Sequence, residues 1–215
     1  MKKVLFLAVV LGLVVFFSLS ALAIPIDITI GFEPVSQIVP VGESVSVDLV
    51  ISGLGDYSEP SLGAFDLDIT YNTAILDFTG YTLASYLGDI SLWEAVDNSG
   101  GETTPGTINL WEISLLYPNQ ANDPFYDPTI PGSGFPPYLD DIQPSSFPLA
   151  TLTFNTLAVG TSSLDISIIA LGDAYGYPLS ADVQSGTIAP VPEPATFILF
   201  GFGLGGIGIL RRKII

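Results

Sequence analysis

Residues 62–71 read Leu-Gly-Ala-Phe-Asp-Leu-Asp-Ile-Thr-Tyr, and this stretch decides the fold class. From Phe65 onward, apolar side chains alternate with Asp66, Asp68 and Thr70. Successive side chains of a β-strand point to opposite faces, so a period of two is typical of a strand with one buried face. The stretch therefore predicts a strand of a half-buried sheet, with the two aspartates on one face.

The same alternation recurs along the chain between residues 24 and 190. Further strands are expected at residues 26–30, 45–51, 108–116, 149–158, 163–169 and 186–188. Glycine, proline, asparagine and aspartate separate these runs, and no convincing amphipathic helix lies among them. Many short strands in one domain predict an all-β fold, an antiparallel jelly-roll β-sandwich.

A proline-rich segment, residues 117–148, interrupts this pattern. It holds eight prolines, at positions 118, 124, 128, 131, 136, 137, 144 and 148. Proline has no N–H to give to a sheet, so the segment is predicted to be a long loop. It is either a binding loop that presents its aromatic side chains or a cover packed over one end of the sandwich.

The charge distribution excludes whole classes of function. Between residues 24 and 190 the chain has 21 acidic residues and no lysine or arginine. Nucleic-acid binding through phosphate contacts needs cations and is therefore not expected. The carboxylates must face water, accept hydrogen bonds or share a cation, and their repulsion should make stability depend on pH and ionic strength.

The chain also has no cysteine and no histidine. Disulfides, thiolate metal sites, cysteine nucleophiles and Ser-His-Asp triads are thereby excluded. The domain must rely on a packed core, for which about 165 residues suffice.

The first 23 residues are predicted to be a secretory signal peptide. Lys2 and Lys3 precede an apolar core at residues 4–17, and Ala21-Leu22-Ala23 forms an A-x-A cleavage signal. The alternative, an uncleaved anchor, is disfavoured because the apolar core is short for a membrane span. The mature protein is expected to start near residue 24 and to be exported.

The C-terminal 25 residues, 191–215, contain a second apolar run at residues 195–210. A 16-residue helix spans about 24 Å, less than the ~30 Å hydrocarbon core of a bilayer. Arg211, Arg212 and Lys213 would stay on the cytoplasmic side, and Pro192 and Pro194 keep the approach to the helix extended. The tail is therefore predicted to be a short, weak membrane anchor. A permanent anchor and a helix-dimer interface built on its glycines are the alternatives.

This tail resembles the PEP-CTERM sorting signal of exported bacterial proteins. The resemblance rests on Pro192, Glu193 and Pro194, followed by the glycine-rich apolar run and by Arg211, Arg212 and Lys213. It implies recognition by an exosortase, a membrane enzyme that is thought to cleave near the motif. The product then goes to the cell surface or the extracellular matrix, often in species that make exopolysaccharide and biofilms, so that membrane insertion is transient.

A second resemblance covers most of the domain. Residues 40–48, 62–68, 149–154 and 171–174 look like the corresponding parts of cohesin-type modules. Cohesins are jelly-roll sandwiches, similar to carbohydrate-binding modules, which bind dockerins in cellulosomes. The dockerin-binding residues are not recognisable in this sequence, so the resemblance implies the fold and not that role.

Catalysis is not expected. Glu94 and Glu112 lie beside Trp93 and Trp111, and paired carboxylates near aromatic residues are typical of glycoside hydrolases. That chemistry needs the two acids across one cleft, however. Glu112 is expected to be an exposed strand acid beside a buried Trp111. The chain is therefore predicted to be a non-enzyme.

Calcium is the one candidate cofactor, because an exported domain meets calcium and the ion takes several oxygen ligands. Asp56 and Glu59 share a loop, Asp66 and Asp68 share a strand face, and Asp173 lies in a turn. No D-x-D-x-D-G loop occurs, so these residues are candidate ligands without a defined site. Solvated carboxylates are the alternative interpretation.

Ligand binding, if the domain binds sugars, would use exposed aromatic faces. The candidates are Trp93, Tyr126 and Tyr138, with packing inside the domain as the alternative. The sequence as a whole predicts a non-enzymatic surface or matrix protein whose sandwich binds a partner protein or a polysaccharide. A carbohydrate-binding module and a permanently anchored surface protein are the other hypotheses.

Overall fold

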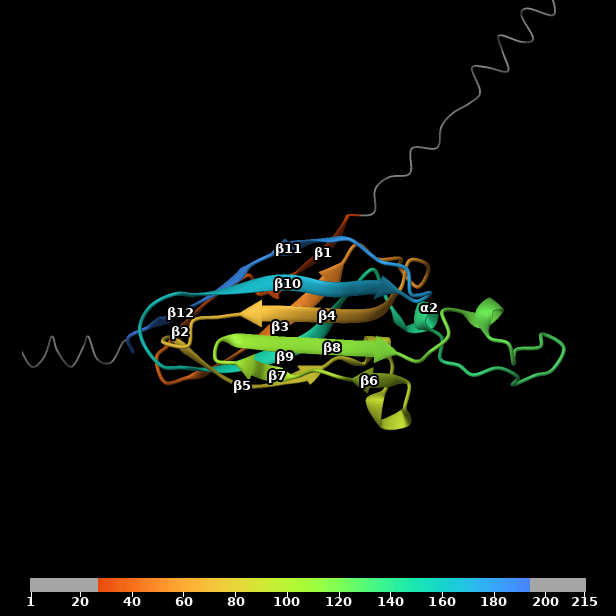
Figure 1. The fold of residues 1–215 in the computed structure, drawn as a ribbon, viewed down its shortest axis with the longest axis horizontal. Helices are drawn as coiled ribbons and strands as arrows, with labels where there is room; N and C mark the ends of the chain where they lie inside the picture. Colours follow the sequence, from red (N-terminus) through yellow and green to blue (C-terminus); the bar gives the residue numbers. More distant parts are fainter. Residues whose placement is uncertain (1–26, 194–215) are drawn as a thin grey trace, which may run out of the picture.

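The computed structural model describes residues 27–193, which form a β-sandwich (Figure 1). The strands are β1 (Ile28–Glu33), β2 (Ser36–Pro40), β3 (Ser44–Ser52), β4 (Leu62–Thr70), β5 (Leu76–Leu83), β6 (Ala95–Asp97), β7 (Gly101–Thr104), β8 (Thr107–Ser114), β9 (Ser146–Thr156), β10 (Ser162–Asp173), β11 (Ala181–Gln184) and β12 (Gly186–Val191). The predicted all-β fold class is confirmed.

Two sheets make up the sandwich. The first has the order β11-β1-β3-β9-β5, and the second has the order β2-β12-β10-β4-β8-β6, with β7 also paired to β8. Most pairs are antiparallel, but β11 runs parallel to β1 and β12 runs parallel to β2. Consecutive strands β1 and β2 lie in different sheets, as do β11 and β12. The first and last segments of the domain therefore pair with each other in both sheets.

The core lies between the sheets and follows from the alternation in the sequence. In β4, Phe65, Leu67 and Ile69 are fully buried, whereas the residues between them face outward. Across the core, Phe154 of β9 meets Tyr71 edge-on, with ring centroids 5.2 Å apart. Burying one such aliphatic or aromatic side chain contributes about 1.5–3 kcal/mol to folding. One continuous apolar core therefore replaces the disulfides that this chain cannot form.

The sequence did not predict five of the strands, namely β2, β5, β6, β7 and β11, nor four short helical turns. These turns are η1 (Ser85–Leu87), η2 (Ile90–Leu92), η3 (Gln120–Asn122) and α2 (Leu139–Ile142). Within residues 27–193, no helix is both long and apolar enough to cross a membrane. The apolar run at residues 195–210, which is predicted to be a membrane anchor, lies outside the described residues.

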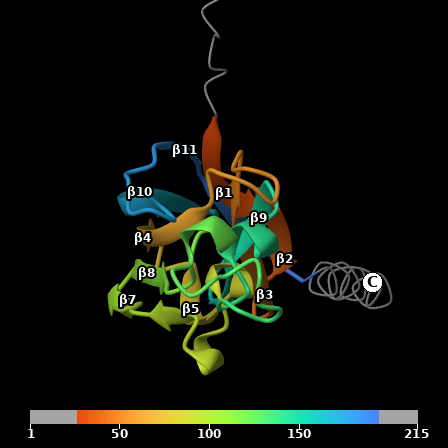
Figure 2. The same ribbon diagram turned by 90° about the vertical axis from the view of Figure 1, so that its right-hand side faces the viewer.

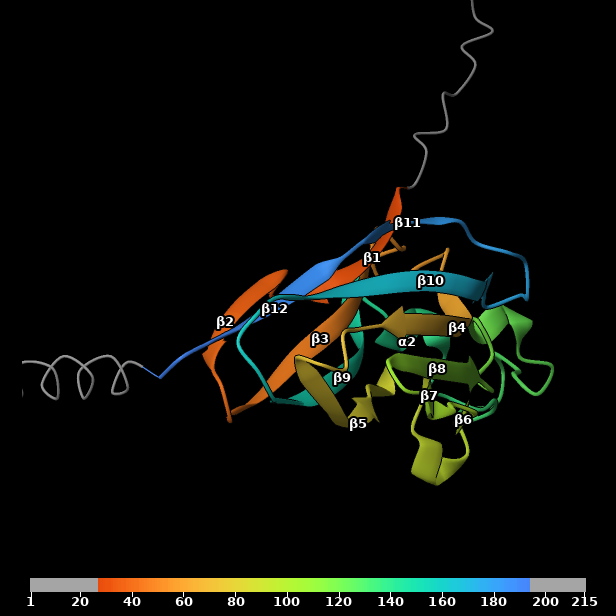
Figure 3. The ribbon, with the colours of Figure 1, turned by 60° about the vertical axis from the view of Figure 1, so that its left-hand side comes forward.

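The sandwich is elongated, and its two ends differ (Figures 1 and 3). We call the end where β12 finishes the tail end; the turns 41–43, 71–75, 105–106 and 157–161 lie there. The opposite, distal end carries the connections 53–61, 84–94, 115–145 and 174–180. Strand β10 runs from the first end to the second, and a strand of 12 residues is roughly 36–40 Å long at about 3.3 Å per residue.

The proline-rich segment lies at the distal end (Figure 2). Its base is held by the buried side chain of Gln143, which accepts a hydrogen bond from the N–H of Leu62 at 2.7 Å and donates to two backbone carbonyls, those of Leu62 and Tyr86. Its tip exposes Phe125 and Phe135, which contact each other edge-on. The segment is shorter than predicted, because β9 begins at Ser146 and includes Pro148. That proline lies at a register shift, where a missing N–H is tolerated.

Candidate binding surface on the second sheet

The outer face of the second sheet carries the two aspartates of β4. Asp66 and Asp68 of β4 lie beside Asn109 of β8. The Asn109 side-chain amide donates to Oδ1 of Asp66 at 2.7 Å and to Oδ1 of Asp68 at 3.0 Å. One amide group thus holds two carboxylates of like charge side by side, which gives this face a fixed, acidic centre.

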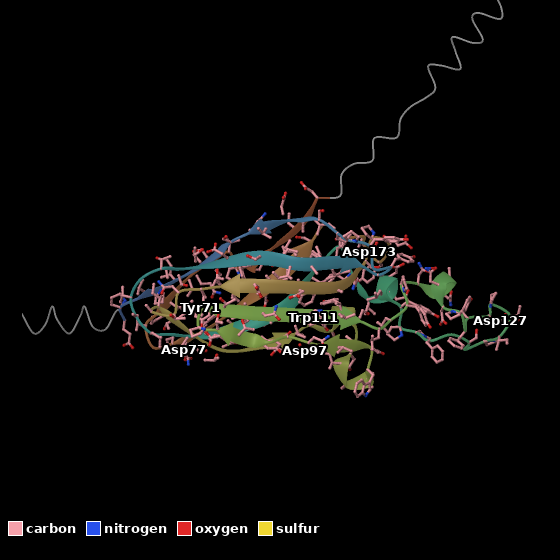
Figure 4. All side chains as sticks on the ribbon, viewed as in Figure 1. Tyr71, Asp77, Asp97, Trp111, Asp127 and Asp173 are labelled. Atoms are coloured by element: carbon pink, nitrogen blue, oxygen red, sulfur yellow. The ribbon has the colours of Figure 1, made fainter. Side chains whose placement is uncertain are left out.

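Further along β8, the side chains of Trp111 and Glu112 lie on the opposite faces of the sheet from those predicted. Trp111 lies on the outer face, directly opposite Asp66, with 39% of its surface exposed (Figure 4). Glu112 points between the sheets and is fully buried, and neither of its carboxyl oxygens has a hydrogen-bond partner. The expectation of a buried Trp111 and an exposed Glu112 was wrong. Because every second side chain of a strand faces the same side, the inward Ile108 and Leu110 place the side chain of Glu112 inward as well, although it is polar.

Burial has a direct electrostatic consequence for Glu112. Loss of water around the carboxyl group, together with the charge of Asp97 on the adjacent strand, raises the pKa of Glu112 to about 8. The side chain is therefore mostly neutral at pH 7. Glu94, the acid considered as its partner in a carboxylate pair, instead accepts a hydrogen bond from the N–H of Asp89 within the turn before β6. The two glutamates thus lie in different environments: Glu112 between the sheets, and Glu94 in a surface turn.

A hollow of about 420 Å³ opens at the distal end of the same face. Its lining includes the small outward-facing residues Ala64, Ala170 and Gly172, with Ile113 and Pro178 also on its wall. The neighbouring Gly63 has no room for a side chain, because an added Cβ would lie 2.4 Å from the backbone oxygen of Asp173. This close approach brings the turn after β10 against β4 and shapes the hollow.

Carboxylates stand at the rim of the hollow. Asp173 Oδ1 accepts hydrogen bonds from the backbone N–H groups of Tyr175 and Tyr177, at 2.9 and 2.8 Å. A second hollow of about 340 Å³ adjoins it and is lined by Asp173, Glu59 and Tyr175. The Tyr175 hydroxyl donates to Glu59, and this hydrogen bond raises the pKa of Tyr175. The surface thus combines an apolar hollow, an exposed indole and acidic edges.

Sequence reasoning missed this hollow. Its only signal is the occurrence of small residues at outward positions of long strands, at Gly63-Ala64 and again at Ala170 and Gly172. Glycine within a strand often marks a place where another group approaches closely. The hydrophobic pattern predicts only which side chains face the core. The small residues on the outer face have no functional group that would mark a site.

The five acids predicted as calcium ligands do not come together. Asp56 accepts a hydrogen bond from the N–H of Ser145, Asp66 and Asp68 share Asn109, and Glu59 and Asp173 line the second hollow. Within residues 27–193, no group of three or more acidic side chains is placed to hold a metal ion. Binding of calcium by fewer protein ligands remains a prediction.

The three predicted ligand-binding aromatic residues have different surroundings. Trp93 is 77% exposed and has a left-handed backbone conformation, with φ of 62°. Tyr126 is half-buried. Tyr138 is buried, and its hydroxyl donates to Asp123 at 3.0 Å, so the expectation that it presents a free face is corrected. Its ring lies inside the base of the proline-rich segment, where it supports the loop.

The predicted sorting residues lie at the boundary of the described chain. Pro192 and Glu193 follow β12 directly, and Glu193 is exposed. Pro194, Arg211, Arg212 and Lys213 lie outside the described residues, as do Ala21 and Ala23 of the predicted signal cleavage site. The motif therefore begins where the folded domain ends, without an intervening linker.

Comparison with known proteins gives matches for the C-terminal segment and for the sandwich. Residues 190–213 match the PEP-CTERM protein-sorting motif. This motif marks an exported protein that is processed by an exosortase and passes through a membrane-anchored precursor. A search of curated protein sequences found no match.

The sandwich is similar to solved cohesin structures. The sixth cohesin of scaffoldin B from Acetivibrio cellulolyticus, solved with a Cel5 dockerin, is 17% identical, with a TM-score of 0.53 over 77% of this chain and 99% of that one. A non-cellulosomal cohesin from the archaeon Archaeoglobus fulgidus is 13% identical, with a TM-score of 0.52 over 80% and 96%. The cohesin module of a Clostridium perfringens family 33 glycoside hydrolase is 16% identical, with a TM-score of 0.50 over 78% and 97%. The domain therefore has the cohesin fold.

The chain is thus a cohesin-like sandwich followed by a PEP-CTERM sorting signal. The likeness to these solved structures establishes the fold of the domain.

Proposed function

We propose that this chain is a non-enzymatic exported protein whose cohesin-like domain binds a partner protein through the outer face of the second sheet. The observation that carries the proposal is the small-residue hollow beside the exposed Trp111 on an otherwise acidic face. Exposed aromatic residues next to a pocket that accepts an apolar side chain are typical of interface hot spots. After processing, the protein is placed at the cell surface or in the extracellular matrix.

Charge narrows the class of partner. The hollow accepts an apolar side chain, while Asp66, Glu59 and Asp173 surround it with negative charge. Because residues 24–190 contain no lysine or arginine, the complementary cations must come from the partner. We expect a protein segment with an apolar anchor flanked by lysine or arginine. Several of the similar cohesins were solved in complex with dockerins, which supports a protein ligand.

The test uses two variants that change the face without touching the core. Ala170→Trp fills the hollow, and Trp111→Ala removes the indole. The matched control is Thr153→Ala on the outer face of the first sheet. Peptides selected from a random display library for binding to the wild-type domain should be enriched in basic residues. They should bind the control variant normally and lose at least about tenfold in affinity, or 1.4 kcal/mol, on either test variant. Unchanged binding to both test variants would refute the proposed surface.

Processing of the tail is tested separately. Mass spectrometry of the protein from its native host should show a C-terminus near the Pro192–Pro194 motif. A mature chain that still ends in Arg-Arg-Lys-Ile-Ile would instead favour the permanently anchored surface protein. This measurement does not depend on the identity of the partner.

A polysaccharide ligand is the second candidate, and the turn at residues 89–94 favours it. There Trp93 projects from a turn fixed by Asp89, whose Oδ1 accepts hydrogen bonds from the N–H and the hydroxyl of Ser91 at 2.7 and 2.6 Å. A rigidly held, exposed indole suits stacking on a sugar ring. Because the surroundings are acidic, a neutral glycan is expected. Retention on neutral polysaccharides that Trp93→Ala abolishes would support this candidate, and a wholly negative glycan array would remove it.

A further inference from the structure

Aliphatic side chains are exposed at the tail end of the sandwich, next to the point where β12 finishes. Leu157 and Val159, in the turn after β9, are 53% and 60% exposed, and Ile38 of the edge strand β2 is 73% exposed. Val191, the last residue of β12, is also exposed. These four residues give the tail end exposed apolar surface close to the exit of the chain.

Hydrogen bonds fix these residues beside the exit of the chain. The N–H of Gly160 donates to the carbonyl of Pro190 at 3.2 Å, which holds the turn 157–161 against β12. The N–H of Val41 donates to the carbonyl of Val191 at 2.9 Å, which holds the end of β2 there. The aliphatic group therefore surrounds the last residue of the domain, and it is placed by the sheet rather than by a loose linker.

The length of the connecting chain limits how far this end lies from the membrane. The apolar run of the sorting signal begins at residue 195, only four residues after Val191. Four residues reach at most about 14 Å when fully extended, at 3.3–3.6 Å each. The headgroup layer of one leaflet is about 5–8 Å thick, half the difference between the whole bilayer and its hydrocarbon core. In the anchored precursor, the tail end must therefore lie within about 6–9 Å of the lipid surface.

The charge along the domain fits the same orientation. Residues 35–42, 157–164 and 186–192, which lie near the exit of the chain, contain no charged residue, although Glu43 and Glu193 follow directly on two of these segments. The connections of the distal end contain many acids, among them Asp56, Asp89, Asp127 and Asp141. Anionic headgroups at a membrane surface repel carboxylates. A domain that rests on these uncharged segments and directs the acids of its distal connections away from the bilayer reduces this repulsion.

We propose that Ile38, Leu157, Val159 and Val191 form a lipid-contacting collar, by which the tail end of the folded domain rests on the bilayer surface while the precursor is anchored. The inference rests on membrane anchoring of the precursor and not on the partner-binding face. The collar makes the domain stand on its tail end, with the distal end directed away from the membrane.

The experiment exploits the absence of cysteine from the chain. The full chain is reconstituted into vesicles of phosphatidylethanolamine and phosphatidylglycerol. It carries a single environment-sensitive NBD label, either at Val159→Cys or, as the matched control, at Ile130→Cys in the exposed tip of the proline-rich segment. Flotation with the vesicles reports membrane anchoring, while NBD emission and quenching by headgroup-spin-labelled lipids report contact of the labelled position.

The expected result is a blue-shifted emission and lipid quenching at position 159, with neither at position 130, in chains that float equally. Adding Ile38→Asp and Leu157→Asp to the Val159→Cys chain should remove most of the quenching without changing flotation, because the carboxylates are repelled from the surface. Circular dichroism checks that each variant is folded.

Three outcomes would overturn the collar. If chains float but show no quenching at position 159, the collar is refuted, whereas membrane anchoring is not. Undiminished quenching in the doubly substituted chain shows that the tether alone brings the domain close. Chains that fail to float remove the premise of an anchored precursor as well.

Discussion

Glu112 should make this domain lose stability as the pH rises from mildly acidic to mildly basic. Its carboxyl group is fully buried without a hydrogen-bond partner, and its pKa is raised from 4.5 to about 8. Between these two pH values, the folded state holds a proton that the unfolded chain has released. Under proton linkage the free energy of unfolding then falls as the pH rises across this window. The stabilising contribution of protonated Glu112 is complete below about pH 4.5 and is lost by about pH 8.

The magnitude follows from the size of the shift. A shift from 4.5 to about 8, at 1.36 kcal/mol per pKa unit, corresponds to a loss of about 5 kcal/mol. That figure is a ceiling, because a core that admits water around the ionised group recovers part of the loss. We expect a loss of about 2–4 kcal/mol from pH 5 to pH 9. Glu112→Gln cannot ionise and should remove this loss, while Glu112→Met should also be more stable than the wild type at pH 9.

The assay is urea unfolding followed by circular dichroism, from pH 5 to pH 9, on the domain without residues 1–23 and 194–215. The chain has no histidine and no cysteine, so few other groups titrate in this window. Glu43→Gln, which removes an exposed acid, is the matched control and should keep the wild-type slope. Parallel pH curves for the wild type and Glu112→Gln would refute the reasoning.

The remaining predictions concern two hydrogen-bonding side chains and the acidic charge of the domain. Gln143→Met leaves the N–H of Leu62 and two carbonyls unpaired and should cost about 2–4 kcal/mol in urea unfolding, whereas a loss below about 1 kcal/mol would show that water replaces them. Asn109→Ala removes the amide that donates to both Asp66 and Asp68 and should cost about 1–2 kcal/mol in urea unfolding at pH 7, and an unchanged free energy of unfolding would contradict this role. Sodium chloride should raise the melting temperature by screening carboxylate repulsion. Added calcium should raise the melting temperature as well, and a rise at micromolar calcium that magnesium does not reproduce would reveal a specific site.

The sequence was sufficient to predict the class of fold and the buried face of the long strands, because hydrophobic alternation and strand geometry share one period. The prediction for Trp111 and Glu112 was wrong because it gave residue type more weight than the phase of the alternation along the strand. The run from Ile108 through Leu110 points every second side chain inward, and the next inward position is Glu112. A single polar residue in an inward position cannot reverse a register that the rest of the strand fixes.

The candidate binding surface depends on long-range pairing, which no local pattern contains. Ala64, Ile113 and Ala170 lie on three different strands and become neighbours only through the order β10-β4-β8. The short edge strands went unpredicted for a related reason, since β6 and β7 hold only a few residues each and take their conformation from β8. The PEP-CTERM signal, in contrast, is a local motif and could be read directly from the sequence.

The position of β12 also decides how the domain would respond to mechanical load. A partner held near Asp173 and a membrane tail leaving at Val191 would pull on opposite ends of the sandwich, along the direction of the strands. Strand β12 lies between β2, to which it is parallel, and β10, to which it is antiparallel. Tension along this axis loads its ladder hydrogen bonds together, in shear, rather than peeling them apart one after another. When the protein is under tension between a membrane and a partner, the hydrogen bonds of β12 would therefore share the load.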